Sequence, residues 1–283
     1  MRKMLIIEGV LAAVLGLAVL VFVLTPVTPR MMLYPLVREA AQAKLAYDTR
    51  QMAVLETPHF VIRYTPADES AVAMVAEAAE AAYSPVTGAL GYAPGGKTLV
   101  VVYPDRRELN KMFGWSGDQS AMGVYWGGVI QVLSPRVWLQ GDAAEEFSRS
   151  GPMVHEFTHL VFDHLTRGNY PRWFTEGIAQ YTEYKVNGFE WRTADNGLNG
   201  RRLYTMAELD GEFDALPNQA LAYRQSLAAV RYIADVHGEA KVREIISALA
   251  AGRGMDEAVA ASLGMDYAAF AAEWPMWAKQ NMR

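Results

Sequence analysis

The first strong pattern in the chain is an apolar run near its start. Residues 5–24 are almost wholly apolar, and a helix of about twenty residues crosses roughly 30 Å of hydrocarbon. Arg2 and Lys3 precede the run, which favours a cytoplasmic N-terminus with the remainder outside the cytoplasm. A cleaved signal peptide is the alternative, but the run is long for one and lacks a small-x-small cleavage site. We therefore expect an uncleaved, single-pass membrane anchor and its flank at residues 1–30.

Beyond the anchor, the pattern predicts a helical tether followed by strands and helices. Residues 31–56 alternate Ala-rich and charged positions, which is typical of a tether. Strand patterns at 59–64 and 98–103 flank a helical pattern at 70–83. The best hairpin signal is residues 124–133, where Gly127-Gly128 suits a two-residue primed turn between two apolar runs.

The last part of the chain is helical in pattern. From Ala215 onward, glycines separate four segments with helical spacing, at 220–237, 239–251, 255–263 and 267–279. Strand patterns dominate the first part of the domain and helical patterns the last, so the expected fold class is α+β.

Composition limits the functional classes. Hydrophobic residues make up 52% and charged residues 20%, an ordinary globular mixture with one additional apolar stretch. The formal net charge of −5 gives no reason to expect a nucleic-acid partner. The chain contains no cysteine, which excludes disulfides, thiolate metal ligands and a thiol nucleophile.

One pentapeptide carries metal chemistry. Residues 155–159 read His-Glu-Phe-Thr-His, the H-E-x-x-H pattern of zinc sites. His155 and His159 lie four residues apart and so share one helix face, where both imidazoles can bind the same ion. Glu156 is rotated by about 100° from His155. It therefore lies beside the ion, where a general base for the metal's water belongs.

A second motif follows downstream. Residues 173–179 read Trp-Phe-Thr-Glu-Gly-Ile-Ala, on a helix expected from Trp173 to Tyr184. A catalytic zinc site needs a third protein ligand, and Glu176 is placed to provide it. With both motifs, the chain resembles the gluzincin branch of the zincin-like metallopeptidases, in particular the peptidase MA-like domains.

The resemblance covers about residues 57–282 and implies both a fold and a site. It implies a zincin-like, two-lobe peptidase domain at 57–283. The upper lobe, at 57–168, would contain a mixed sheet and the zinc helix, and the lower lobe, at 169–283, would be helical. It also implies that one zinc ion is held by three ligands and served by one base. The ligands would be His155, His159 and Glu176, and the base Glu156.

Other side chains near the two motifs are candidates for supporting roles. Asp163 lies four residues after His159 and either orients a ligand imidazole by a hydrogen bond or is a solvated carboxylate near the helix end. The thermolysin-type pattern has an aspartate four residues after the glutamate ligand, but this chain has Gln180. A strict thermolysin relative is therefore not expected, and the groups around the ligands must be arranged differently.

The resemblance also suggests an oxyanion donor and a substrate-binding strand. Tyr223 is the candidate donor, since peptidase MA-like domains have a similar Y-x-x-S segment; the alternative is a tyrosine packed in the helical core. Tyr181 and Tyr184 are weaker candidates, and Arg224 could hold a substrate carboxylate. The hairpin at 123–133 would supply an edge strand that pairs with extended substrate, or would simply close the sheet.

These features predict a membrane-anchored, zinc-dependent peptidase that hydrolyses peptide bonds by a zinc-activated water, with Glu156 as general base. No G-x-M-E-N-like segment for a free amino terminus is evident, which favours an endopeptidase. The expected partners are a peptide or protein substrate and the membrane. Two alternatives remain: a catalytically silent, zinc-containing peptide-binding protein, and a structural envelope protein that only needs the metal to fold. Retention of Glu156 disfavours the peptide-binding alternative, because binding alone needs no base.

Overall fold

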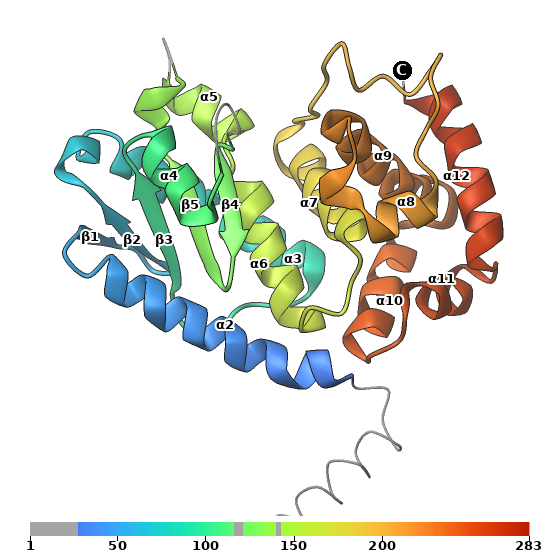
Figure 1. Ribbon diagram of the computed structural model, residues 1–283, viewed down its shortest axis with the longest axis horizontal. Coiled ribbons are helices and arrows are strands. Elements are labelled where there is room, and N and C mark those ends of the chain that lie inside the picture. The colour runs from blue at the N-terminus through green and yellow to red at the C-terminus, as the bar shows by residue number, and fades with distance from the viewer. Residues whose placement is uncertain (1–27, 116–120, 140–142, 283) are drawn as a thin grey trace, which may run out of the picture.

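The computed structural model describes residues 28–115, 121–139 and 143–282. The anchor expected at residues 5–24 lies outside this part of the chain. Among the described residues, no helix combines the length and the apolar character needed to cross a membrane. Figure 1 shows a half that contains the sheet, a helical half, and helix α6 (Met153–Thr166) between them.

The sheet has five strands in the order β1-β2-β3-β5-β4. Their bounds are Ala53–Glu56 for β1, Phe60–Tyr64 for β2, Thr98–Tyr103 for β3, Gly123–Trp126 for β4 and Val129–Leu133 for β5. The three central strands are parallel, and the two outer strands run antiparallel to their neighbours. The expected mixed sheet is therefore confirmed, and β4 forms one of its edges.

The hairpin that places β4 at this edge follows from two glycines. Gly127 has φ 56° and Gly128 has φ 81°, backbone conformations that glycine adopts without strain and that a primed two-residue turn requires. The turn pairs Trp126 with Val129 and Tyr125 with Ile130. The hairpin expected from the sequence is thus confirmed.

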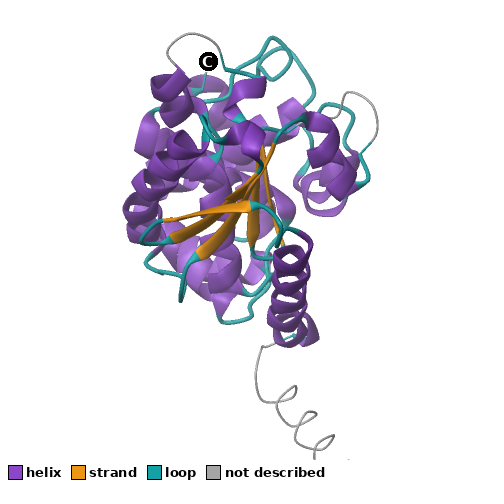
Figure 2. Ribbon diagram, turned by 90° about the vertical axis from the view of Figure 1, so that its left-hand side faces the viewer, coloured by secondary structure: helices purple, strands orange, loops and turns teal. Residues whose placement is uncertain are grey.

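Alternating residues of the central strands face two different layers of helices. Val100 and Val102 of β3 belong to a core with helices α3 (Val72–Leu90) and α6. Val101 of the same strand packs on the other side of the sheet with helices α2 (Pro29–Asp48) and α4 (Arg106–Phe113). Figure 2 shows the sheet between these helices. The side-chain period of two along each strand therefore builds a three-layer half.

Helix α2 and strand β1 differ from the tether expected at residues 31–56. The inner side of α2 packs on the domain: Leu45 is buried, and the Gln42 side chain donates to the carbonyl of Gly128 at 2.8 Å. Arg63 of β2 donates to Thr49, just after the helix, at 2.8 Å. The alternation of apolar and charged residues at 31–48 is therefore that of a helix packed on the domain with its outer side exposed. The sheet begins with β1, before the domain boundary expected at residue 57.

The helical half is built from α7 to α12. Their bounds are Arg172–Asn187 for α7, Met206–Gly211 for α8, Gln219–Tyr232 for α9, Glu239–Ala250 for α10, Met255–Leu263 for α11 and Tyr267–Asn281 for α12. The four helical segments expected after Ala215 are confirmed, and the first continues as a π-helical turn, Ile233–His237. Helix α8 and the short helix α5 (Ala143–Ser150) were not predicted. Helices α6 and α7 lie side by side and carry both sequence motifs.

Candidate metal centre

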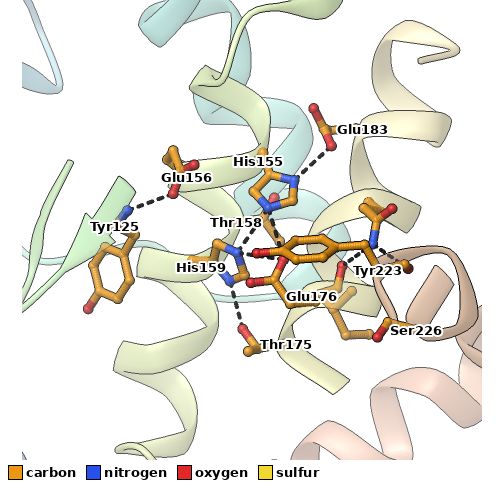
Figure 3. A network of polar contacts seen from close by, with 12 residues as sticks. Tyr125, His155, Glu156, Thr158, His159, Thr175, Glu176, Glu183, Tyr223 and Ser226 are labelled. Carbon is orange, nitrogen blue, oxygen red and sulfur yellow. Dashed lines mark hydrogen bonds and ion pairs between the residues drawn. The ribbon is translucent and has the colours of Figure 1, made fainter. Parts of the chain in front are cut away.

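Three side chains from two helices converge on one point (Figure 3). His155 and His159 lie one turn apart on α6, and their Nε2 atoms are 3.0 Å from each other. Glu176 comes from α7, and its Oε2 lies 3.2 Å from Nε2 of His155 and 3.5 Å from Nε2 of His159. The three residues that the motifs single out are therefore brought together by the packing of α6 against α7.

The geometry fits a zinc ion. Tetrahedral zinc with bonds of about 2.0–2.1 Å separates its ligand atoms by roughly 3.3 Å, which agrees with the three distances above. Two imidazoles and one carboxylate also match the donor set of catalytic zinc sites. Among the described residues, these three form the group that could hold a metal ion.

Each of the three candidate ligands is oriented by a further contact through its other polar atom. The Nδ1 of His155 lies 2.8 Å from Oε2 of Glu183, and the Nδ1 of His159 lies 2.7 Å from the hydroxyl of Thr175. Arg172 binds the remaining oxygen of Glu176, Oε1, at 2.8 Å. Such contacts fix the ring tautomer and leave Nε2 of each histidine free to bind a metal ion.

Charge distribution supports a ligand role for these groups. Burial alone would raise the pKa of Glu176, but Arg172 and the two histidines hold it well below its ordinary value. The carboxylate is therefore ionised. Burial alone would lower the pKa of His155, but Glu183 and Glu176 raise it well above its ordinary value. The site thus concentrates negative charge around the imidazoles, as a divalent cation requires.

Glu156 lies beside the ligands rather than among them, as the 100° rotation predicts. It is 7% exposed, and its Oε2 accepts a hydrogen bond from the backbone N–H of Tyr125 at 2.6 Å. Burial raises the pKa of Glu156 above its ordinary value, although the charges of His155 and His159 oppose this rise. A buried carboxylate next to a metal site is suited to accept a proton.

Asp163 has neither of the two roles considered for it, because it does not contact a ligand imidazole and its side chain is fully buried rather than solvated. Its carboxylate is occupied by the hydroxyls of Tyr125 at 2.6 Å and Tyr170 at 2.8 Å and by the guanidinium of Arg38 at 3.2 Å. The hydrogen-bond partner of the His159 ring is Thr175 instead. Asp163 lies a full turn beyond His159 on α6, where it faces α2 and β4 rather than the ligands.

Tyr223 of α9 extends toward the space among the three ligands (Figure 3). Burial, and next the charge of Glu176, raise its pKa, so its hydroxyl stays protonated. The hydroxyl of Tyr181 points elsewhere and donates to Glu239 at 3.0 Å, and Tyr184 packs beneath Arg231. Of the three tyrosines considered, only Tyr223 faces the ligands.

Arg224 does not reach the site. It is 3% exposed and forms an ion pair with Glu190, so the suggestion that it holds a substrate carboxylate is wrong. Gln180 also has a structural role, because its amide donates to the carbonyl of Tyr223 at 2.8 Å and thereby joins α7 to α9.

Two residues of the centre were missed by the sequence analysis. Glu183 lies seven residues after Glu176, two turns along α7, so the helical period could have placed both on one face. Thr175 directly precedes the glutamate ligand, and no spacing rule distinguishes it. A pocket of about 480 Å³ lies between α3, α7 and α10 but contains none of the centre's residues. The convergent ligand atoms, and not this pocket, mark the candidate site.

Two imidazoles, a carboxylate and an adjacent buried glutamate form the kind of site that metal-dependent hydrolases use. The sequence profile of the Peptidase MA superfamily matches residues 126–280, more than half of the chain, from the end of β4 to α12. The protein belongs to this superfamily, whose members are typically metal-dependent and act on peptides. A comparison with curated proteins finds no match.

Proposed function

We propose that the protein is a zinc-dependent peptidase of the gluzincin type that cleaves within peptide or protein chains. The observation that carries the proposal is the convergence of His155, His159 and Glu176 beside Glu156. A protein that only bound peptides would need no buried carboxylate next to its metal ligands.

The proposal also includes a membrane anchor at residues 1–30, with the catalytic domain outside the cytoplasm. Protease added to intact cells should then digest the domain, whereas a cytoplasmic domain would survive.

The chemistry follows from the residues around the ligands. When bound, zinc would polarise a water molecule and the carbonyl of the scissile bond. Glu156 would accept the proton of that water and transfer it to the leaving amine. The N–H of Tyr125 keeps one carboxylate oxygen of Glu156 in place, and Glu183 and Thr175 keep the two imidazoles in place. The protein thus supplies a positioned base and preorganised ligands.

Strand β4 is suited to bind extended substrate. It is an edge strand, and its outward side faces α6, where Glu156 already accepts the N–H of Tyr125. In an antiparallel ladder, backbone groups alternate between the two sides, so Gly123 shares this outward direction. A substrate backbone added along this edge would lie next to α6, where the ligands are. Backbone pairing binds many sequences with little selectivity.

Tyr223 is proposed to donate a hydrogen bond to the oxyanion that forms on the scissile carbonyl. Tyr223→Phe is then expected to lower kcat about 100-fold with little change in KM, because the bond forms only in the transition state. Steady-state kinetics with a fluorogenic peptide measure both constants. Tyr181→Phe is the matched control, since it removes a hydroxyl that binds Glu239 away from the site. Equal effects of the two changes would assign Tyr223 a packing role only.

The function itself is tested by metal removal from the full-length chain. The purified protein should contain about one zinc per chain and cleave internal bonds of a mixed peptide library. A chelator should abolish cleavage while circular dichroism stays unchanged, and added zinc should restore it. Stoichiometric zinc without any cleavage would favour a peptide-binding protein. Unfolding upon chelation would favour a structural metal.

A further inference from the structure

Asp163 is a fully buried carboxylate to which three separate elements donate. Tyr125 of β4 donates through its hydroxyl at 2.6 Å, Tyr170 of the α6–α7 connection at 2.8 Å, and Arg38 of α2 at 3.2 Å. The Asp163 side chain is 0% exposed and that of Arg38 is 13% exposed. A buried carboxylate is tolerated only with a counter-charge and hydrogen bonds, and Arg38 supplies that charge across 125 positions of sequence.

The tyrosines around Asp163 are held as donors. Burial, and next the charge of Asp163, raise the pKa of Tyr125 and of Tyr170 well above their ordinary value. The same two causes raise the pKa of Tyr34, which also lies on α2, to about 12. The Tyr34 ring packs so closely over Gly168 that a Cβ there would lie 2.9 Å from it. Helix α2 therefore closes the cluster from one side and cannot shift without exposing it.

The cluster continues to the candidate base through one residue. The hydroxyl of Tyr125 binds Asp163, and the backbone N–H of the same residue binds Glu156. Next to it, a Cβ on Gly123 would lie 2.8 Å from Cγ of Glu156, so β4 and the base are in close contact. Tyr125 is thus fixed at its ring end by α2 and α6, and it fixes Glu156 at its backbone end.

We propose that Asp163, held by Arg38 of α2, is a positioning residue for the peptidase reaction: it holds Tyr125 so that the backbone of β4 fixes Glu156. The inference rests on the proposed function, because it assigns Glu156 its role as base. It makes α2 a part of the catalytic unit, although α2 contributes no ligand. The proposed connection between α2 and the site consists of two side-chain contacts, Arg38 with Asp163 and Asp163 with Tyr125. Each can be removed by a separate substitution.

The first test removes a single hydroxyl. Tyr125→Phe keeps the backbone N–H and the ring but releases Asp163, and it should lower kcat about ten-fold, part of the 10²–10⁴ that a general base supplies. Zinc content should stay unchanged and KM should change less than kcat. Tyr103→Phe is the matched control, because it removes a buried hydroxyl of β3 that binds Gln131, remote from Glu156. The same kcat for both variants would overturn the proposal.

The second test removes the counter-charge on α2. Arg38→Met should lower kcat at least as far as Tyr125→Phe, and Arg38→Lys should restore part of the loss because it keeps the charge. Arg63→Met is the control, since Arg63 binds Ala46 and Thr49 at the other end of α2. If Arg63→Met lowers kcat equally, docking of α2 in general matters and the specific role of Asp163 is wrong.

Amide hydrogen exchange tests the positioning role of Asp163 independently of the proposed peptidase function. The N–H of Tyr125 is bonded to Glu156, so amide hydrogen exchange in β4 should speed up at least about ten-fold in Tyr125→Phe and Arg38→Met, but not in the two controls. This readout needs neither zinc nor activity. If the wild type cleaves nothing, the function fails while exchange still tests the positioning. Unchanged exchange in both variants would overturn the positioning whatever the activity.

Discussion

Glu156→Gln is expected to abolish peptide hydrolysis while zinc stays bound. The amide keeps the shape of the side chain but cannot accept the proton of the attacking water, so kcat should fall by about 10²–10⁴ or more. The three ligand atoms and their partners Glu183, Thr175 and Arg172 are untouched, so metal content should remain near one ion per chain. The measurement is kcat on a fluorogenic peptide together with zinc analysis of the same sample.

A glutamate in a similar pair outside the site provides the control. Glu80 of α3 binds the ring of His59 at 2.7 Å and contacts none of the candidate ligands, so Glu80→Gln removes a comparable charge and should leave kcat within about two-fold of the wild type. A Glu156→Gln protein that retains full activity would show that another group is the base. Loss of zinc from it would show that Glu156 is itself needed to hold the metal.

Gly177→Ala is expected to destabilise the protein by about 3 kcal/mol and to weaken metal binding. A Cβ at this position would lie 2.4 Å from the carbonyl oxygen of Ser226 and 2.6 Å from Cγ2 of Val230. One of these atoms belongs to the backbone of α9, so the two helices must separate. Gly177 directly follows the ligand Glu176, and such a shift would therefore displace the carboxylate from the histidines. Denaturant unfolding and zinc titration measure the two effects.

A second glycine within a helix serves as the control that separates the steric effect of the added Cβ at Gly177 from the change in helix propensity. At Gly88 of α3, a Cβ would meet nothing within 4 Å, so Gly88→Ala should be neutral or stabilise the protein by up to about 1 kcal/mol. If Gly177→Ala were equally harmless, α7 and α9 would not be in the tight contact described above. The glycine of the second motif is thus explained by helix packing and not by metal chemistry.

Helical spacing within one pentapeptide was enough to predict that His155 and His159 share a face with Glu156 beside them, and the second motif added Glu176 as the third candidate ligand. The hairpin was equally clear, because Gly127 and Gly128 need the positive φ of a primed turn. By contrast, the partners of Asp163 lie on α2, β4 and the α6–α7 connection. A spacing of one helical turn does not tell whether the Asp163 carboxylate faces the His159 ring or a neighbouring element. Only the tertiary fold shows that it faces away from His159.

The N-terminal elements were misjudged for a related reason. Helix α2 exposes apolar side chains on its outer surface, for example Leu33 and Leu36, so its pattern gave no clear buried stripe. Strand β1 has four residues, alternately half-buried and exposed, which is too weak a period-two signal in a single sequence. Both elements are recognised only by what they pack against.

The short length of β4 limits the tendency of the protein to aggregate. An open sheet edge is a template on which other chains can assemble into aggregates, yet this one spans four residues and has one of its outward amides already engaged by Glu156. Pairing with so short a strand can add to the binding of a substrate at the metal centre, but by itself it forms too few ladder bonds to hold a second copy of the protein. The protein can therefore keep this edge open without recruiting copies of itself.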